Sequence, residues 1–444
     1  MIKNFSLYNY ITGAVLFVII SGCTTRTLFD EKYVSDKIEQ RSGFILPVDS
    51  SDSLQLPAGV TPEDSLTEEE SVAIALWNNP HLQIVLADLG FARADLIEAG
   101  TLPNPVFSLL FPIGPKQMEF TLYYAIDVLW QRPKRVAASK LNAEKVAESL
   151  VQYGLDLVRD VYVSFAELNK FREQLRVLED EAALDTEIAE IASSRLEVGD
   201  ISEPEETALH LAASLSKEAS LYARRDMETS RIRFLNLLGL TGDEPEIQIK
   251  PTPLELLTLS DPEQMMKTAL AYRPDLRAAE LEIEIAGKKL GWERSKIFNL
   301  TAMLDANAEG KEGFEMGPGA QFEIPLFYFN QGGTTRARAE MERAANNYIA
   351  VQQSVRSEVM ESYQDYLASS KAYEMLNNEL IPSATQAVEN GEMAWITGEI
   401  SYLEFLEFKR QFLNARLRIL EAESEVRKNI ANVYYSIGGK MITF

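Results

Sequence analysis

The chain has 444 residues, of which 46% are hydrophobic and 25% charged, and this composition is sufficient for a large folded core. Its formal net charge of −24 makes nucleic acid and anionic membrane surfaces unfavourable partners. With two histidines and one cysteine, the chain offers almost nothing for a His/Cys metal site or a histidine-based catalytic triad. We therefore expect no enzyme, no metal site and no cofactor.

The N-terminus has the pattern of a secretion signal. Lys3 precedes an apolar run over residues 11–20, which is too short for a membrane-spanning helix of about 20 residues. Cys23 follows directly, and residues 20–23 resemble the bacterial lipoprotein box, in which the cysteine is acylated. We expect residues 1–22 to be a signal peptide and residues 23–62 to be a mostly extended, lipidated tether. A chance resemblance without processing is the alternative.

The rest of the sequence is duplicated with a period of roughly 200 residues. The segment Gly199-Asp200-Ile201-Ser202 returns as Gly398-Glu399-Ile400-Ser401, and the Pro80 region returns around Pro274. We place the first repeat at residues 63–240, a linker at 241–261, the second repeat at 262–440 and a tail at 441–444. Such a long period excludes short solenoid repeats and predicts two large units that pack against each other.

Each repeat is predicted to begin with helices and to continue as two strands. In the first, Thr67 can cap a helix that Pro80 interrupts, a second helix runs to about Ala99, and the strands lie within 106–126. In the second, the strands lie within 300–324: residues 300–309 alternate apolar with polar side chains, a loop is expected at 313–318, and a return strand at 319–324.

Strands with one apolar and one polar face can lie on a soluble core or against lipid. Four strands cannot close a barrel, and an open sheet edge is not tolerated in lipid. A membrane location would therefore require several chains that share one sheet, and three chains give a plausible even number of strands.

Very long helices are predicted after each strand pair, at about 134–198 and 335–397, the second interrupted by Pro382. Sixty-odd residues at 1.5 Å each extend on the order of 90 to 100 Å. Two parallel apolar stripes on the first helix indicate neighbours on both sides, as in a closed helical barrel. Gly199 and Gly398 suit the left-handed end of a helix, and Ser202 with Glu205 and Ser401 with Glu404 fit capping boxes of returning helices.

Two strands followed by a long helical hairpin, present twice, resemble the TolC-like outer membrane efflux proteins across nearly the whole mature chain. Specific motifs are Leu102-Pro103-Asn104-Pro105, Arg273-Pro274-Asp275-Leu276, and Ile324-Pro325-Leu326-Phe327 leading into Asn330-Gln331-Gly332-Gly333. The resemblance implies a mainly helical α+β fold: a homotrimer with a twelve-stranded β-barrel in the outer membrane and a twelve-helix tunnel across the periplasm. It also implies docking to a periplasmic adaptor and an inner-membrane pump.

The family resemblance also implies roles for individual residues. The helical tips would contact the adaptor through Arg195, Leu196, Val198, Gly199, Asp200, Ile201, Ser202, Gly398, Glu399, Ile400 and Ser401. Family members often carry carboxylates six and nine residues after the second tip glycine, here Glu404 and Glu407, and Glu205 holds the first of these positions in the first repeat. In a trimer each would form a ring that attracts cations. Capping or simple exposure is the alternative, and Trp395 is a candidate aromatic constriction.

Cargo follows less directly from the sequence. Lys134-Arg135 and Phe329-Asn330-Gln331-Gly332 resemble the heavy-metal cation branch, although these motifs mark fold junctions. We expect a passive exit duct, with metal cations slightly favoured over drugs or other small molecules as cargo. A periplasmic coiled-coil scaffold lipoprotein would explain the helices and lipid, but not four alternating strands at matched places.

Overall fold

The computed structural model describes residues 28–47, 56, 65–111, 118–240, 248–310 and 313–440. By their contacts these residues form two compact units, each drawing on both sequence repeats. We call them the sheet unit (residues 1–33, 86–149 and 275–351) and the hairpin unit (residues 34–85, 150–274 and 352–444). The contact units therefore do not coincide with the two repeats predicted from the sequence.

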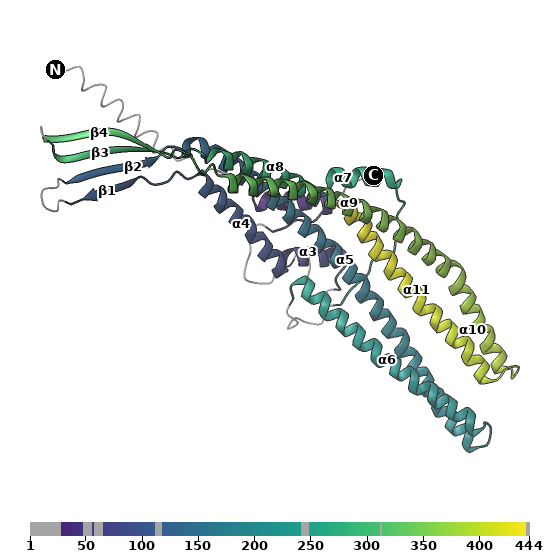
Figure 1. Cartoon of the computed structure of the whole chain (residues 1–444). Helices are drawn as coiled ribbons and strands as arrows, with labels where there is room; N and C mark the ends of the chain where they lie inside the picture. The colour runs from purple at the N-terminus through teal and green to yellow at the C-terminus, as the bar shows by residue number, and fades with distance from the viewer. Residues whose placement is uncertain are drawn as a thin grey trace. The chain divides into compact units, whose positions relative to one another are not determined.

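Helices dominate the described chain (Figure 1). In chain order the helices are α2 (Glu31–Ser42), α3 (Glu68–Asn78), α4 (Pro80–Gly100), α5 (Val128–Glu197), α6 (Glu203–Leu238), α7 (Pro262–Tyr272), α8 (Pro274–Ser295), α9 (Gln331–Met375), the π-helical segment η1 (Leu376–Leu380), α10 (Ile381–Ile396) and α11 (Tyr402–Ser436). The strands are β1 (Val106–Leu110), β2 (Glu119–Ala125), β3 (Leu300–Gly310) and β4 (Gly313–Phe322). None of the described helices carries an apolar stretch long enough to cross a bilayer.

The four strands form one antiparallel sheet in the order β1-β2-β3-β4. Residues directly opposed in the register share a face of the sheet. The row Phe107, Leu122, Leu304 and Pro318 therefore lies on one face. This face is apolar in every strand; it is formed by Phe107, Leu109, Phe120, Leu122, Tyr124, Ala302, Leu304, Ala306, Met316, Pro318, Ala320 and Phe322.

The opposite face of the sheet is more polar. Its central row runs from Ser108 through Thr121 and Asp305 to Gly317, and the Thr121 hydroxyl donates a 2.6 Å hydrogen bond to Asp305 Oδ1. On the apolar face, by contrast, Phe107 is 61% exposed within the chain and Phe322 65%. The alternation predicted for residues 300–306 is therefore confirmed, and the described chain leaves the apolar face uncovered although Val106, on the other face, is also 62% exposed.

Strand β4 begins earlier than the sequence analysis predicts. Residues 313–318, expected to form a loop, belong to the strand, and the pairing of β3 with β4 extends to Gly310 opposite Gly313. Pro318 lies opposite Leu304 in this pairing, on the strand that has a neighbour on one side only within the chain. Packing explains the glycine at position 319, because a Cβ atom there would lie 2.8 Å from Met303 Cγ.

The connection from β4 into α9 is fixed by Asn330. This residue is buried and has a positive φ of 54°, the one such non-glycine residue in the described chain. Its amide donates 2.8 Å hydrogen bonds to the carbonyl oxygen and Oε2 of Glu293 on α8. Hydrogen bonds from Lys296 and Asn330 lower the pKa of Glu293 although burial opposes this shift. The Asn330-Gln331-Gly332-Gly333 motif thus forms a strand-to-helix anchor.

The long helices are observed at the predicted places, with two differences at proline. Helix α5 begins at Val128 rather than near 134, because Pro133 is accommodated close to its N-terminus. Helix α9 is followed by η1, in which the Ile381 N–H bonds to the Leu376 carbonyl, and Pro382 then lies in the first turn of α10. The interruption predicted at Pro382 is therefore a π-helical turn.

In each predicted repeat, the residue at the break between the first two helices contacts the last turn of the helical hairpin of the same repeat. The Asn79 amide, between α3 and α4, donates a 2.8 Å hydrogen bond to the Leu237 carbonyl at the end of α6. Arg273, between α7 and α8, is 3.5 Å from the Ser436 carbonyl at the end of α11. Its guanidinium also pairs with Glu358. In the hairpin unit, both helix breaks seen in the sequence therefore hold the base of a hairpin.

The expectation of an extended segment is wrong for residues 31–42, which form α2. The backbone N–H of Tyr33 bonds to Asp30 Oδ1 at the start of this helix. Val34 and Ile38 are completely buried. Ile38 reaches α5 at Gly154, where a Cβ atom would lie 2.5 Å from Ile38 Cδ1. Val34 and Ile38 are four residues apart and share one face of α2, so their burial stabilises this helix. The polar composition of the segment does not predict it.

Candidate functional site

The first helical tip is the turn between α5 and α6. Gly199 has a φ of 76°, and the Asp200 N–H bonds to the Arg195 carbonyl at 2.9 Å, as in a Schellman motif. The Arg195 side chain also pairs with Asp200 at 2.7 Å, while Val198 is 79% exposed. The predicted tip residues therefore do lie at a chain reversal, with an apolar side chain presented to solvent.

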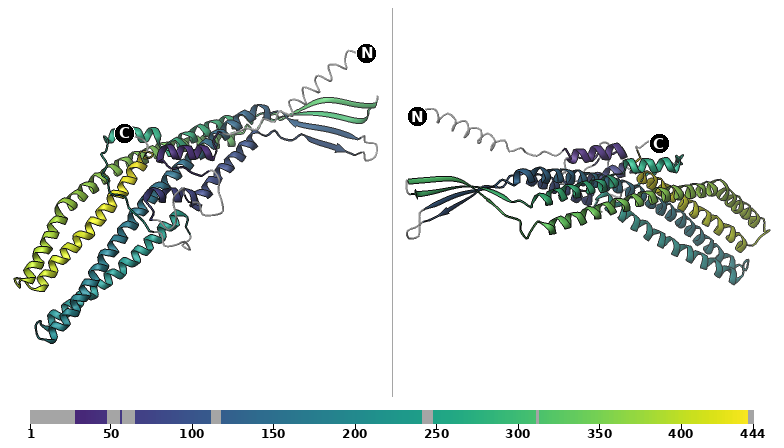
Figure 2. Two further views of the ribbon diagram at one scale, coloured as in Figure 1. Left: turned by 180° about the vertical axis from the view of Figure 1, so that it is seen from behind. Right: turned by 45° about the horizontal axis from the view of Figure 1, so that its top comes forward.

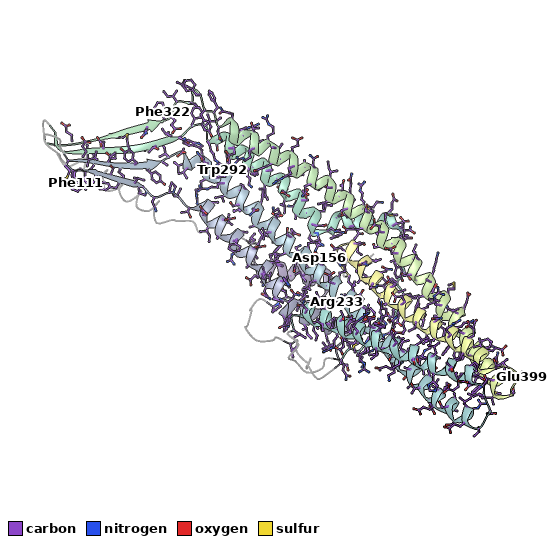
Figure 3. All side chains as sticks on the ribbon, turned by 60° about the horizontal axis from the view of Figure 1, so that its bottom comes forward. Phe111, Asp156, Arg233, Trp292, Phe322 and Glu399 are labelled. Carbon is purple, nitrogen blue, oxygen red and sulfur yellow. The ribbon has the colours of Figure 1, made fainter. Side chains whose placement is uncertain are left out.

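The second tip, between α10 and α11, reverses in the same way. Gly398 has a φ of 78°, and the Glu399 N–H bonds to the Ala394 carbonyl at 2.8 Å. Glu399 lies at this turn in Figure 3. In both views of Figure 2 the helices on either side of each tip run antiparallel beside each other. Both glycines thus adopt the left-handed conformation that the sequence predicts for them.

The helices that leave the tips begin differently, which corrects one prediction. At α11 the capping box is complete: Ser401 Oγ accepts from the Glu404 N–H at 3.3 Å, and Glu404 Oε2 accepts from the Ser401 N–H at 2.8 Å. At α6 the Ser202 side chain makes no capping hydrogen bond. Pro204 in the first turn of α6 already lacks an N–H, so one fewer donor needs a cap there.

The three candidate gate carboxylates have different partners. Glu404 is held by Ser401, and these hydrogen bonds lower its pKa. Glu407 is paired with Arg410, and the Gln411 amide donates to Glu407 Oε1 at 3.1 Å. Glu205 lies in the first turn of α6. Glu404 therefore serves as the cap of α11 with a lowered pKa, and the charge of Glu407 is partly balanced by its neighbour.

Trp395 packs against aromatic side chains of α11. Its ring is stacked on Phe405 with centroids 5.6 Å apart and an interplanar angle of 1°, and it meets the edge of Tyr402 at 5.1 Å. The same apolar cluster includes buried Ala192 of α5 and Leu209 of α6. Trp395 thus contributes to the contact between the two hairpins near their tips.

A buried charged cluster lies beside these rings, and sequence reasoning missed it. Lys409 Nζ is 3.2 Å from Asp185 Oδ1 and 3.3 Å from Glu181 Oε1, so it joins α11 to α5. Tyr402 is also buried, and its hydroxyl is without a hydrogen-bond partner in the described structure. Burial and the nearby Asp185 and Glu181 charges raise its pKa. The sequence signal that could have located this cluster is Lys409 itself, because it lies on the same helical face of α11 as the apolar residues Tyr402 and Phe405.

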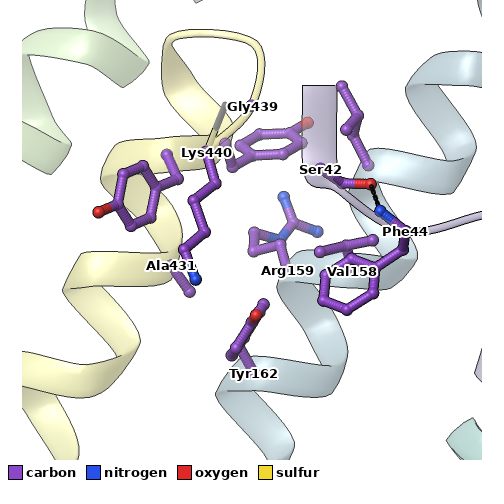
Figure 4. A pocket seen from close by; sticks show the side chains of 11 residues that line it. Ser42, Phe44, Val158, Arg159, Tyr162, Ala431, Gly439 and Lys440 are labelled. Carbon is purple, nitrogen blue, oxygen red and sulfur yellow. Dashed lines mark hydrogen bonds between the residues drawn. The ribbon is translucent and has the colours of Figure 1, made fainter. Parts of the chain in front are cut away.

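A small cavity in the hairpin unit gives no substrate site. It has a volume of about 30 Å³ and lies between α2, α5 and α11 around Ser42, Arg159 and Tyr162 (Figure 4). The buried Tyr162 hydroxyl is unpartnered within the described chain, and burial raises its pKa. A space of this size holds about one water molecule. The cavity therefore suits an internal water rather than a substrate.

No group of three or more His, Cys, Asp or Glu side chains that could hold a metal is found among the described residues. His81 begins α4 and His210 lies on α6, so the two histidines are on different helices. Cys23, the signal peptide at 1–22 and the tail at 441–444 lie outside the described residues, and their assignments stay predictions.

Comparisons with known proteins agree with this architecture. The model of a family described as outer membrane efflux protein matches residues 265–439. The cobalt-zinc-cadmium resistance protein CzcC of Cupriavidus metallidurans is 22% identical over 360 residues, covering 80% of this chain and 86% of the relative. Solved structures of the outer-membrane channel OprN and of CusC superpose with TM-scores of 0.71 and 0.70 at 16% and 18% identity. They cover 88% and 89% of this chain and 98% and 97% of theirs.

Proposed function

Because this chain belongs to the outer membrane efflux protein family, we propose that it is the outer membrane exit duct of a tripartite efflux system. It receives substrate from a periplasmic adaptor and an inner-membrane pump, and transport through it is passive. One observation carries this proposal: a four-stranded sheet that leaves its apolar face and both of its edges uncovered by the described chain.

Assembly of three chains would give each exposed sheet edge, β1 and β4, a hydrogen-bonding partner strand. Unpaired backbone groups are not tolerated in lipid, so β1 of one chain pairs with β4 of the next until twelve strands close into a barrel. The apolar face then contacts lipid, and the face with Thr121 and Asp305 lines the lumen. A stripe on α6, with Leu211 59% and Leu215 55% exposed, supports a seam to a neighbouring chain in a twelve-helix tunnel.

Intersubunit disulfides test this arrangement. Ser108→Cys on β1 is combined in turn with Gly317→Cys or Gln321→Cys on β4, and the full-length chain is oxidised in outer membranes. β1 and β4 are opposite edges of the sheet in one chain, so a bond between them forms between chains. We expect one combination to give a covalent trimer. The unmodified chain, whose one cysteine is Cys23, is the control. Uncrosslinked monomer in every combination would refute the barrel and favour a scaffold lipoprotein.

Both tips are proposed to dock the adaptor. Their reversals are alike, and each presents exposed residues, such as Val198 at the first tip and Ile396 beside the second. Val198→Asp would place a charge in this contact without disturbing Gly199. We expect loss of adaptor co-purification with retention of the trimer, whereas unchanged co-purification would exclude the first tip from the contact.

The gate is proposed to include carboxylate rings from the start of α11. The capping box lowers the pKa of Glu404 and so favours its charged form, and Glu407 contributes less because Arg410 balances it. Glu205 is a lesser contributor, and Trp395 acts through packing. We expect Glu404→Gln to reduce the cation preference of single channels in planar bilayers more than Glu407→Gln does. Unchanged ion selectivity in both variants would refute a carboxylate gate.

Cys23 is proposed to anchor the chain to the outer membrane through acyl groups. The short apolar run before it and the adjacent small residues support this assignment. Metabolic labelling with a palmitate analogue should mark the wild-type chain and leave Cys23→Ser unmarked. Equal labelling of both chains would refute acylation at this cysteine.

Metal cations are the cargo we favour, because the relative from Cupriavidus metallidurans is named for resistance to cobalt, zinc and cadmium. Drugs or other small molecules are the alternative. Cells that express the adaptor and pump, with or without this chain, distinguish the two. We expect the chain to raise tolerance to zinc, cobalt or cadmium and to leave drug tolerance unchanged. The opposite pattern would support the alternative.

A further inference from the structure

Three polar side chains meet on the first hairpin close to its tip, and none of them is among the predicted adaptor-contact or gate residues. Ser193 lies on α5, and Glu206 and His210 lie four residues apart on α6. His210 Nε2 is 2.8 Å from Ser193 Oγ and 3.1 Å from Glu206 Oε1. Ser193 Oγ donates to Glu206 Oε1 at 3.2 Å. One nitrogen and two oxygens therefore form a small triangle with three short edges.

This geometry does not suit hydrolysis. In a catalytic triad the acid and the serine bind opposite nitrogens of the imidazole ring, so that a proton can pass through it. Here both partners approach the same nitrogen, Nε2. Glu206 therefore does not hold the imidazole ring through Nδ1. It also cannot stabilise, from that side, the imidazolium that would form if Nε2 accepted the serine proton. A nucleophilic role for Ser193 is thereby excluded.

The same triangle suits a metal ion. Zinc binds imidazole nitrogen and carboxylate oxygen at about 2.0 to 2.2 Å in tetrahedral geometry, which places neighbouring ligand atoms about 3.3 Å apart. The three measured separations are 2.8, 3.1 and 3.2 Å, so an ion could seat on this face with little side-chain movement. Two ligands at i and i+4 of one helix share a face, as in zinc-binding helices.

Exposure and charge allow a cation to enter. The side chains of His210 and Glu206 are 49% and 21% exposed, so water can complete the coordination shell. The first turn of α6 also carries Glu203 and Glu205, which add negative potential nearby. Arg195, two residues after Ser193 in the chain, is already paired with Asp200. Two strong ligands and a weaker hydroxyl give modest affinity, which suits an ion that must leave again.

We propose that Ser193, Glu206 and His210 form a low-affinity binding site for a divalent transition-metal cation such as Zn²⁺. The site lies on the α5–α6 hairpin and holds the ion through His210 Nε2, a Glu206 carboxylate oxygen and the Ser193 hydroxyl. Binding is a property of the chain alone. Its use as a station for cargo rests on the proposed efflux function.

Copper(II) is a sensitive probe of this site because it binds such ligands more tightly than zinc does and is paramagnetic. The chain contains two histidines, so His81→Ala is a matched control for His210→Ala. Purified full-length trimer without a histidine tag is given one equivalent of Cu²⁺ per chain. Electron spin-echo spectra then report the remote nitrogen of a coordinated imidazole, a signal that carboxylates and amines do not give.

The imidazole signal should be present in the wild-type chain and in His81→Ala, and absent from His210→Ala. Glu206→Gln, which keeps the size of the side chain, should weaken binding about tenfold, and Zn²⁺ should compete. Retention of the signal in His210→Ala, or a wild-type spectrum showing carboxylate ligation alone, would overturn the site. His210→Gln keeps a hydrogen-bonding group between α5 and α6, so it repeats the test if the alanine variant loses the trimer.

A zinc-tolerance assay separates the site from the proposed function. If His210→Gln lowers zinc tolerance while deletion of the chain lowers it further, the site contributes to export. If His210→Gln matches the wild-type chain while deletion abolishes tolerance, the cargo role of the site is refuted and the exit duct stands. If deletion changes neither metal nor drug tolerance, the proposed function fails, although Cu²⁺ binding would still identify the site.

Discussion

Replacing Lys409 with alanine would test whether a buried charge cluster holds the two hairpins together. Lys409 Nζ contacts Asp185 at 3.2 Å and Glu181 at 3.3 Å, and the Lys409 and Asp185 side chains are only 9% and 10% exposed. With an effective dielectric constant of about 20, each contact contributes about 5 kcal/mol of attraction, most of which offsets desolvation. Loss of the ammonium group leaves the buried Asp185 carboxylate and the partly buried Glu181 carboxylate uncompensated, at a cost of about 3–5 kcal/mol.

Hydrogen exchange of the full-length protein in detergent measures this cost locally. Peptides over residues 178–192 and 402–412 should exchange on the order of 10² to 5 × 10³ times faster in Lys409→Ala if the hairpins open as a unit. Arg410→Ala is the matched control, because it removes an exposed pair on the same helix that contributes about 1 kcal/mol or less. Equal exchange in the two variants would refute a structural role for the buried cluster.

Further predictions concern the tip turn, the strand-to-helix anchor and the capping box. Gly398→Ala should destabilise the second tip by about 1–2 kcal/mol because of its positive φ, seen as faster proteolysis there; wild-type cleavage rates would contradict this. Asn330→Ala should lower the free energy of unfolding of the chain by about 2 kcal/mol through the lost bonds to Glu293, measured by heating in detergent, and an unchanged melting temperature would exclude the anchor. The folded-state pKa of Glu404 is lowered, so it stabilises the start of α11 above its unfolded pKa, and this is lost as pH falls through the folded value. Exchange at residues 401–405 should therefore rise on acidification, but remain flat in Glu404→Gln.

Features governed by local chemistry were predictable from the sequence. Prolines and capping residues located the break at Pro80, and glycine located both tips, because each acts on its own backbone. Alternation located β3, since a period of two is independent of what covers the strand. The motif around Asn330 was recognised, although its bond to Glu293 depends on a helix distant in sequence.

Features that depend on distant partners were not predictable. The α2 helix is stabilised by contact between Ile38 and Gly154, and nothing in the polar sequence around Ile38 announces that partner. From the sequence alone, Lys409 is expected to be a solvent-exposed charge, and only the structure places Asp185 beside it. The trio that includes His210 likewise requires α5 and α6 to meet in one particular register. In each case the missing information is which helix faces which.

The π-helical segment η1 changes the rotational phase of everything that follows it. Each residue of an α-helix turns the chain by about 100°, so the one additional residue in a π turn rotates α10 by that amount relative to a straight continuation of α9. The rotated face brings Gly391 against Phe408, where a Cβ atom would lie 2.7 Å from the ring. A chain shortened by one residue within 376–380 would keep every side chain of α10 and present the wrong side of the helix to α11.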